Sequence, residues 1–489
     1  MLAVLLVTVD ATVLVVAVPH MSEDLKPSGT QLLWIADVYS FVIAGFLVSM
    51  GSLGDRIGRK KLLLTGTVAF GAASALCAYA TSPEMLILAR ALLGAAGATL
   101  MPSTLALIRN VFPDPKQRSL AIGIWGSAAS AGEAVGPVVG GLLLEHFWWG
   151  SVFLINVPVA AVLVIVGFRL LPESRNPHPG PWDLVSVGLS LVGMVSVVYA
   201  VKEAAVNGFG WDIVAAATVG VAALLWFARR QLTLKSPLFD VRLFYHRGFC
   251  GAVVANMLTI LGLTGLVFFL SQFLQLVQQR SPLEAGLFSV PTAVGAVGTG
   301  LLAGVIARTT SVRSAVSGGL IAVGLALGAC VTLNEGTSFV VLGALLFVAG
   351  LGSGLSFAVT ADVILSSVPK DQAGAASAVS ETAYELGAAL GIALIGSVVT
   401  GIYRAFTLPG LIPLNIAAAA HDSLGGAIEA ATKLPPNQAA QLLAAGRDAF
   451  TTGLQTATGA GSAVLLAAAV AAWFILRGQK LEESEPEQP

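Results

Sequence analysis

Residues Gly51 to Lys61 read GSLGDRIGRKK and separate two apolar blocks of the chain. Glycine lets a helix end turn tightly, and basic residues favour the cytoplasmic side of a membrane. Asp55 and Arg59 can form a charge contact that breaks when parts of the protein move. We predict a cytoplasmic turn that takes part in gating, with a simple positive-inside anchor as the alternative. The candidate gating residues in this turn are Gly51, Asp55, Arg56, Gly58 and Arg59.

The composition of the whole chain is that of a membrane protein. Of 489 residues, 56% are hydrophobic and 11% are charged, and the mean hydropathy is +0.85. A soluble protein carries about 25% charged residues. The apolar residues form blocks of roughly 20, the length that crosses ~30 Å of hydrocarbon as a helix. A net charge of -1 argues against nucleic acid as a partner. The chain is therefore predicted to be an all-α, polytopic membrane protein.

The apolar blocks predict fourteen membrane helices. Their expected ranges are 2–19, 31–52, 62–80, 84–108, 118–144, 151–171, 183–205, 211–229, 248–276, 283–307, 313–333, 337–367, 373–403 and 454–477. Of the 26 lysines and arginines, six fall in the external segments and one, Arg90, lies within a span, so the positive-inside rule predicts both termini in the cytoplasm. No cleavable signal peptide is expected. The first helix is short, which raises the expectation of a cytoplasmic leader missing from this chain.

The longest polar interruption, 405–453, is predicted to be external. It contains two helix-like patches, Asp422–Leu434 and Asn437–Phe450, split by Pro435 and Pro436. We expect two short amphipathic helices, which either cap the external mouth or pack on the surface without a transport role. The tail 481–489 is acidic and contains proline, so it is predicted to be disordered.

Charged residues inside the apolar blocks indicate function. A charge at the centre of a membrane helix costs roughly 2.5–3.5 kcal/mol on insertion scales, so such residues usually face the bundle interior and mark a path for ions, protons or charged cargo. We therefore predict a proton-coupled transporter. The candidates for proton coupling are Asp10, Asp37, Arg90, Glu133, Glu381 and Glu385.

A buried carboxyl group can couple two opposite fluxes. When it is shielded from water it favours the protonated form, and a lipophilic cation that arrives beside it favours the ionised form and expels the proton. Asp10, near mid-depth of its helix, is the preferred proton carrier, with a structural polar contact as the alternative. Arg90 can keep a neighbouring acid ionised until that acid takes a proton.

Asp37 is a candidate substrate ligand. Trp34 lies three residues earlier and Phe41 four residues later on the same face of the predicted helix. An anionic group flanked by aromatic rings suits an organic cation through charge and cation–π contact. The alternative is an interfacial acid within an ordinary aromatic belt.

Glu381 and Glu385 form a second candidate site. They are four residues apart, and Tyr384 shares their face of the predicted helix. Two buried carboxylates on one stripe repel each other unless one is protonated or a cation lies between them. We expect this stripe to bind protons and a cationic substrate, through Glu381 and Tyr384 above all. A packing role through hydrogen bonds is the alternative.

Several motifs resemble the major facilitator superfamily. The turn Gly51–Lys61 is similar to its signature loop, G-x-x-x-D-R-x-G-R-[RK]. The segment RALLGAAGA, Arg90 to Ala98, resembles its buried-arginine motif. The segment GEAVGPVVGG, Gly132 to Gly141, is similar to the glycine-proline motif associated with its antiporters.

Further motifs resemble one branch of that superfamily. The segments VDATVLVVAVP (Val9–Pro19), LLWIADVYS (Leu32–Ser40) and FLINVP (Phe153–Pro158) are similar to the fourteen-helix drug:proton antiporters. The segment SETAYELGAALG (Ser380–Gly391) resembles the subgroup that exports quaternary ammonium compounds, dyes and viologens. The resemblance covers essentially the whole chain.

The resemblance implies two pseudo-symmetric six-helix bundles with two inserted helices between them. The expected parts are an N-terminal bundle at 1–172, the inserted helices with their linkers at 173–247, a C-terminal bundle at 248–480 that includes the external loop 405–453, and the tail 481–489. It also implies that Arg90 acts with Asp10. The residues expected to gate through the antiporter motif are Gly132, Gly136, Pro137, Gly140 and Gly141. Glu133 departs from the family pattern, and it is either an added proton site or a residue without function.

The implied function is multidrug efflux from a bacterial cell. We expect an antiporter of the inner membrane that exports lipophilic organic cations, such as quaternary ammonium compounds and dyes, in exchange for protons by alternating access. The proton motive force would drive it as a monomer, without a cofactor or a metal. The chief alternative is a proton-coupled exporter of an endogenous metabolite or lipid. A membrane enzyme is more remote, since no HExxH pair or metal-ligand cluster is present. A channel is equally remote, because it would need a continuous pore rather than rocking halves.

Overall fold

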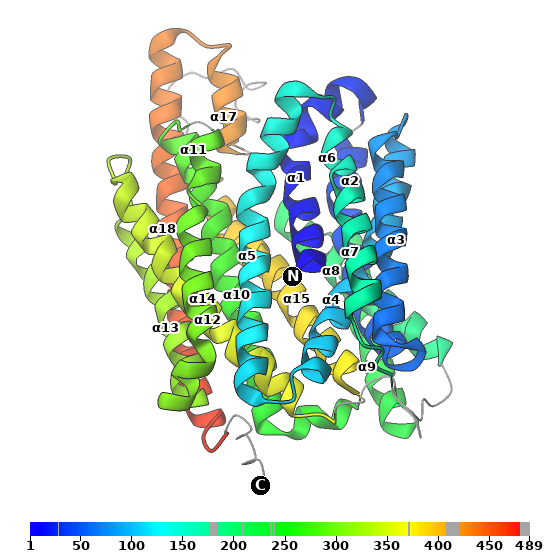
Figure 1. The fold of residues 1–489 in the computed structure, drawn as a ribbon. Coiled ribbons are helices and arrows are strands. Elements are labelled where there is room, and N and C mark those ends of the chain that lie inside the picture. The colour runs from blue at the N-terminus through cyan, green and yellow to red at the C-terminus, as the bar shows by residue number, and fades with distance from the viewer. Residues whose placement is uncertain are drawn as a thin grey trace.

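The computed structural model describes residues 1–479, apart from residues 28, 176–182, 208–209, 235–236, 238–239, 281, 370–371, 407–419 and 422. This described part of the chain is helical and contains no strand. Its long helices run side by side through one bundle, and α18 ends at the same end of the bundle as the turn between α2 and α3 (Figure 1). We call this end of the bundle the turn end.

The helices follow the apolar blocks of the sequence. The first part of the chain forms α1 (Leu2–Leu25), α2 (Gly29–Ile57), α3 (Arg59–Ala78), α4 (Pro83–Val111), α5 (Pro115–His146), α6 (Ser151–Leu154) and α7 (Asn156–Leu170). A helix pair and a short 3-10 helix follow as α8 (Leu184–Asn207), α9 (Trp211–Thr233) and η1 (Val241–Tyr245). The last part forms α10 (Arg247–Gln272), the π-helical turn η2 (Phe273–Val277), α11 (Pro282–Leu287), α12 (Val290–Thr309), α13 (Val312–Ala329), η3 (Cys330–Thr332), α14 (Phe339–Ser366), α15 (Ala373–Tyr403), α17 (Leu424–Ala431) and α18 (Pro436–Ile475).

The prediction of an all-α membrane protein is confirmed. In the described residues, ten helices are long and apolar enough to cross a membrane, and eleven if the bent pair Val38–Leu47 and Ser49–Ile57 is one span. Each of the fourteen predicted ranges overlaps a helix. The count of fourteen spans is consistent with this arrangement and stays a prediction.

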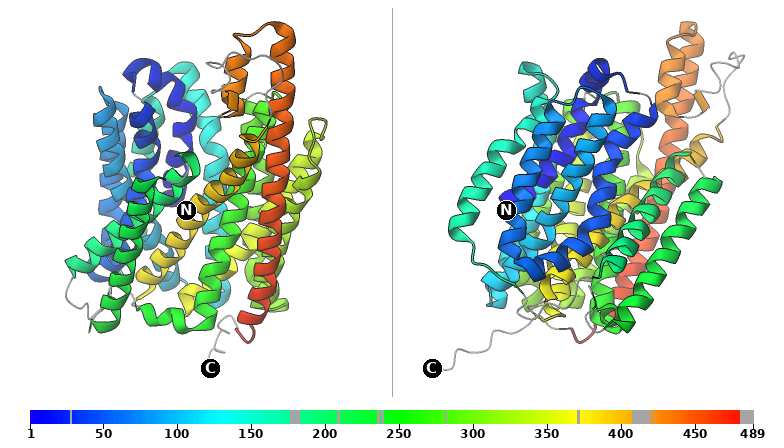
Figure 2. Two further views of the ribbon diagram at one scale, coloured as in Figure 1. Left: turned by 180° about the vertical axis from the view of Figure 1, so that it is seen from behind. Right: turned by 90° about the vertical axis from the view of Figure 1, so that its right-hand side faces the viewer.

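The prediction for the end of the chain is wrong in one respect. The predicted short helix 437–450 and the predicted span 454–477 form a single 40-residue helix, α18. No proline follows Pro436 in this segment, and Thr451 donates its hydroxyl to a carbonyl oxygen four residues back, so its polar side chain is satisfied within the helix. The first part of α18 projects beyond the other helices together with α17 (Figures 1 and 2).

The first helix is also longer than predicted. α1 continues past residue 19 to Leu25, through a polar segment that contains His20 and Asp24. The indole N–H of Trp149 donates a 2.8 Å hydrogen bond to Asp24 Oδ2. This contact ties the polar end of α1 to the segment that follows α5.

Two buried cores lie in the two halves of the bundle. Helices α1 to α7 surround one core, which contains the fully buried Phe70, while helices α10 to α18 form most of the other, which contains Leu320. The pair α8 and α9 lies outside both. Val198 of α8 packs against Phe41 of α2 in a small separate cluster. Behind the bundle, α8 lies against both α2 and α15, and α9 packs on α8 (Figure 2).

An ion pair anchors the helix pair at its turn end. The Arg230 guanidinium on α9 donates hydrogen bonds of 2.6 and 3.0 Å to the Asp183 carboxylate, which directly precedes α8. These hydrogen bonds hold the pKa of Asp183 well below its usual range. The carboxylate therefore stays charged, and the pair stays closed, through the neutral pH range.

Glycines set the closest contacts between the halves. A Cβ atom on Gly123 of α5 would overlap the backbone carbonyl oxygen of Gly300 on α12. A Cβ atom on Gly51 of α2 would likewise overlap the backbone carbonyl oxygen of Gly374 at the start of α15. Small residues of this kind let helix backbones approach closely in lipid.

The glycine-proline segment of α5 faces α1. Added Cβ atoms on Gly132, Gly136 and Gly140 would run into side chains of α1, whereas Gly141 has nothing within 4 Å of its Cβ position. Three of the four predicted motif glycines thus serve close packing of α5 on α1. Gly141 does not share that role.

Two substitutions on α5 test the close contact between the halves of the bundle. Gly123→Val would force the halves apart at α12 and should destabilise the protein by about 1–3 kcal/mol, the usual cost of overpacking. Gly141→Val places the same side chain in open space and should leave stability unchanged. Thermal unfolding of the two purified variants in detergent measures the difference, and equal melting temperatures would contradict the proposed close contact.

Candidate functional site

A buried polar cluster lies between α1, α3, α4 and α7. Asp10 Oδ2 of α1 is 3.9 Å from Arg90 Nη1 of α4. Asn156 of α7 donates a 2.6 Å hydrogen bond to Asp10 Oδ1 and a 2.8 Å hydrogen bond to the hydroxyl of Ser74 on α3. All four residues are at most 1% exposed. The two charged residues that the resemblance paired, Asp10 and Arg90, are therefore neighbours.

The two charged groups of Asp10 and Arg90 lie near each other but are not hydrogen-bonded. A separation of 3.9 Å is too long for a hydrogen bond. Asp10 Oδ2 and the Arg90 Nε and Nη1 atoms have no hydrogen-bond partner among the described residues. The Arg90 guanidinium lies over the ring of Tyr39, 5.0 Å from its centroid. Buried charges that are incompletely hydrogen-bonded are costly, so this cluster can respond to a proton or to a helix shift.

Sequence reasoning gave Asn156 no role. It used the segment around this residue, FLINVP, only as part of a family motif. A lone amide in an apolar helix was the available signal, because a buried amide needs hydrogen-bond partners. The structure shows that the partner is the candidate proton carrier Asp10.

The second half of the protein carries an acidic site on α15. Glu381 is 4% exposed, and its Oε1 atom has no hydrogen-bond partner in the described residues. Glu385, one turn later, is half-buried and close enough to interact electrostatically with Glu381. Asn256 of α10 donates a 3.2 Å hydrogen bond to the carbonyl oxygen of Ser380, and its own buried Oδ1 has no partner within the described part of the chain.

A row of aromatic rings crosses from one half to the other beside this site. Tyr384 of α15 meets Phe357 of α14 edge to face, with 6.1 Å between the ring centroids. Phe357 stacks on Trp125 of α5 at 5.7 Å. The Trp125 indole is fixed by a 2.9 Å hydrogen bond that it donates to the hydroxyl of Thr104. The predicted ligand Tyr384 therefore belongs to an aromatic wall shared by both halves.

The other predicted aromatic pair is also in contact. The rings of Trp34 and Phe41 lie 6.0 Å apart, and Phe41 also meets Tyr199 of α8 at 6.3 Å. Phe41 is 5% exposed, whereas Trp34 is 41% exposed. The side chains of Asp37, Glu133 and Pro137 lie outside the described residues.

The turn between α2 and α3 contacts the opposite half. Asp55 accepts hydrogen bonds from the backbone N–H groups of Gly374 at 3.1 Å and Ala375 at 3.3 Å, at the beginning of α15. Arg59 donates hydrogen bonds of 2.6 and 2.8 Å to the Asp55 carboxylate. Both residues are buried. The predicted Asp55–Arg59 contact is thus present, and it reaches the start of α15.

The conformation of the turn explains why residue 58 is a glycine. Gly58 has a φ of 111°, which L side chains rarely adopt. A Cβ atom there would also meet the Glu173 carboxylate, which accepts hydrogen bonds from the N–H groups of Lys60 and Lys61. Arg56 is half-buried at the end of α2.

A second set of contacts joins the halves at the same end. Arg118 Nε donates a 2.8 Å hydrogen bond to Asp362 of α14, and the hydroxyl of Ser119 donates one of 2.7 Å to the same carboxylate. Arg109 donates a 2.5 Å hydrogen bond to the carbonyl oxygen of Val368. Sequence analysis did not single out Arg118. Together with Asp55, these contacts close the bundle at the turn end.

The described residues include no group of three or more His, Cys, Asp or Glu side chains that could hold a metal ion. A cavity of about 430 Å³ lies between η1, α10, α13 and α18, and none of the predicted site residues that the structure describes lines it. The polar clusters described above are therefore the candidate functional site.

Comparison with known proteins agrees with this architecture. The family model of the Major Facilitator Superfamily matches residues 1–392. Over 472 residues the chain is 48% identical to the "Multidrug efflux pump LfrA" of Mycolicibacterium smegmatis, covering 96% of this chain and 94% of that protein. It is 37% identical over 472 residues to the "Methyl viologen resistance protein SmvA" of Salmonella typhimurium, covering 96% and 95%. The crystal structure of the human organic anion transporter MFSD10 shares the fold, with a TM-score of 0.64, 14% identity and 97% of each chain covered.

The helical architecture, the family model and these two relatives lead to one conclusion: the chain belongs to the Major Facilitator Superfamily of membrane transporters.

Proposed function

We propose that this transporter exports lipophilic organic cations, such as quaternary ammonium compounds and dyes, in exchange for protons. It would act as a monomer in the bacterial inner membrane, with the turn end in the cytoplasm and the proton motive force as its energy source. The names of the two relatives, a multidrug efflux pump and a methyl viologen resistance protein, support cationic drugs as cargo.

One observation carries the proposal. Asp10 Oδ2 and Glu381 Oε1 are both buried in the bundle and lack a hydrogen-bond partner among the described residues. A buried ionised group without partners is very unfavourable, so each carboxyl gains by holding a proton or by facing a cation. A site that accepts either one, but not both, exchanges protons for cationic cargo.

The aromatic wall supports a flat or quaternary cation as that cargo. Tyr384 lies between Glu381 and Glu385 in the sequence of α15, and its ring meets that of Phe357 on α14. Aromatic faces attract organic cations, and they favour large apolar cations over small hydrated ones. Glu381 would supply the charge for binding, and the rings would supply contact area.

The closed turn end supports alternating access. Asp55 binds the first N–H groups of α15, where the helix dipole favours a negative charge. The contacts of Arg118 and Arg109 lie at the same end. We propose that these contacts hold the cytoplasmic side closed and break when the halves rock to admit cargo.

The export proposal is tested by drug susceptibility of a pump-deficient bacterium that expresses this chain. The wild type should confer resistance to ethidium and benzalkonium. Asp10→Asn and Glu381→Gln should each lower the drug efflux rate by about tenfold or more, because charge-assisted interactions contribute ~1.5–3 kcal/mol. Resistance equal to the empty vector for the wild type would rule out drug export and would favour an endogenous metabolite or lipid.

Glu429→Gln is the matched control for these substitutions. Glu429 is an exposed acid of α17 that pairs with Lys433 at 3.3 Å, and its loss should leave resistance unchanged. If the two site variants retain as much resistance as the control, the assignment of Asp10 and Glu381 is incorrect.

The gate is tested with Asp55→Asn. The substitution removes the charge that holds both Arg59 and the start of α15, so ethidium transport should fall by about tenfold while ethidium binding stays within about twofold. Asp114→Asn is the control, because Asp114 only caps α5 through the N–H of Lys116. Transport in inside-out vesicles and ethidium fluorescence polarisation measure the two effects; full transport by Asp55→Asn would refute a gating role.

A further inference from the structure

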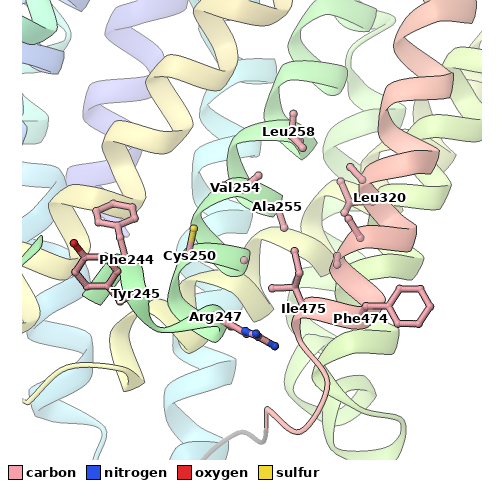
Figure 3. A pocket seen from close by; sticks show the side chains of 14 residues that line it. Phe244, Tyr245, Arg247, Cys250, Val254, Ala255, Leu258, Leu320, Phe474 and Ile475 are labelled. Atoms are coloured by element: carbon pink, nitrogen blue, oxygen red, sulfur yellow. The ribbon is translucent and has the colours of Figure 1, made fainter. Parts of the chain in front are cut away.

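The cavity between η1, α10, α13 and α18 has no part in the export mechanism proposed above. Its volume of about 430 Å³ lies within the usual ~300–1,000 Å³ of small-molecule sites. Of the 14 residues that line it, Arg247 is the one with a formal charge. Figure 3 shows Arg247 at the lower edge of the cavity, Phe244 and Tyr245 on one side, Phe474 on the other, and Leu258 at the top.

The cavity extends along α10. Its lining follows α10 from Arg247 to Leu258, an interval that rises about 17 Å at ~1.5 Å per residue. That depth is about half of the ~30 Å hydrocarbon core, which is the depth filled by the acyl chain of one leaflet. Small residues create the space, with Gly251 on α10 and Ala468 on α18 among them.

The cavity opens at the level of a membrane surface. Tyr245 is 78% exposed, and tyrosine side chains gather where a bilayer meets water. Phe474, on the other side of the mouth, is 68% exposed. A second cation lies near the end of α18, where the Arg313 guanidinium covers the ring of Trp473 at 4.5 Å. The mouth therefore combines aromatic rings with positive charge, and its interior is apolar.

We infer that this cavity binds one anionic phospholipid from the membrane leaflet at the turn end. An acyl chain lies along α10 as far as Leu258, and the lipid phosphate meets the Arg247 guanidinium. Guanidinium groups bind phosphate by strong, charge-assisted hydrogen bonds. Among the described residues, the lining offers no carboxylate to bind a cation, so this lining is unsuited to the proposed drug cargo. This lipid site is independent of the export proposal.

The test is native mass spectrometry of the purified, delipidated full-length protein. It is titrated with phosphatidylglycerol and with phosphatidylcholine of the same acyl chains. The wild type should retain one phosphatidylglycerol in preference to phosphatidylcholine. Arg247→Ala should weaken retention of phosphatidylglycerol by about tenfold, the usual effect of losing a charged hydrogen bond. Ala468→Phe should abolish retention of both lipids by filling the cavity.

Arg229→Ala is the matched control. Arg229 is an exposed arginine near the end of α9 and does not line the cavity, so its loss should leave lipid retention unchanged. Equal retention of the two lipids by the wild type would overturn the inference, as would equal retention by Arg247→Ala and Arg229→Ala. If Ala468→Phe fails to fold, the comparison of the two arginine variants decides alone. Drug efflux by the wild type does not enter this test, so failure of either proposal is recognised separately.

Discussion

A carboxyl group inside a lipid-embedded bundle is stable only if it accepts a hydrogen bond, holds a proton or lies next to a cation. Asp10 has one strong donor in Asn156 and an incomplete pair with Arg90, while Glu381 has a buried oxygen without any donor among the described residues. An unmade hydrogen bond of this kind costs about 1–3 kcal/mol, and more for a charged group. A proton and a cationic guest relieve the same cost at the same atom. They therefore exclude each other, which is the requirement for exchange.

One helix, α15, connects the two places where we propose that charge controls the state of the protein. The beginning of α15 is held by Asp55 through the N–H groups of Gly374 and Ala375. Glu381 lies on the same helix, about 10 Å further along at ~1.5 Å per residue. A helix of this length moves as a stiff unit. A change of charge at Glu381 can therefore shift the contact at the turn end, and opening of that end can alter the surroundings of Glu381.

Local features of the sequence were sufficient to predict the helices and part of the candidate site. Charges in apolar blocks, such as Asp10 and Arg90, are visible without knowledge of the fold, because their cost is set by depth in the membrane. Partners distant in sequence were visible only where the family resemblance supplied the pair, as it did for Asp10 and Arg90. Arg118 and Asp362 are 244 residues apart, and each alone resembles an ordinary helix-end charge. The sequence analysis also failed to predict that α18 is one uninterrupted helix. Hydropathy predicts where the apolar, membrane-spanning part of a helix ends, but the helix itself can continue beyond that point.

The most direct measurement of the central claim is proton release on cargo binding. Purified protein in weakly buffered detergent solution near neutral pH is mixed with a lipophilic cation such as ethidium, and a pH indicator records the protons released per bound cation. The account predicts release by the wild type and a marked loss of release in Glu381→Gln. Saturable binding of the cation without any proton release would contradict it.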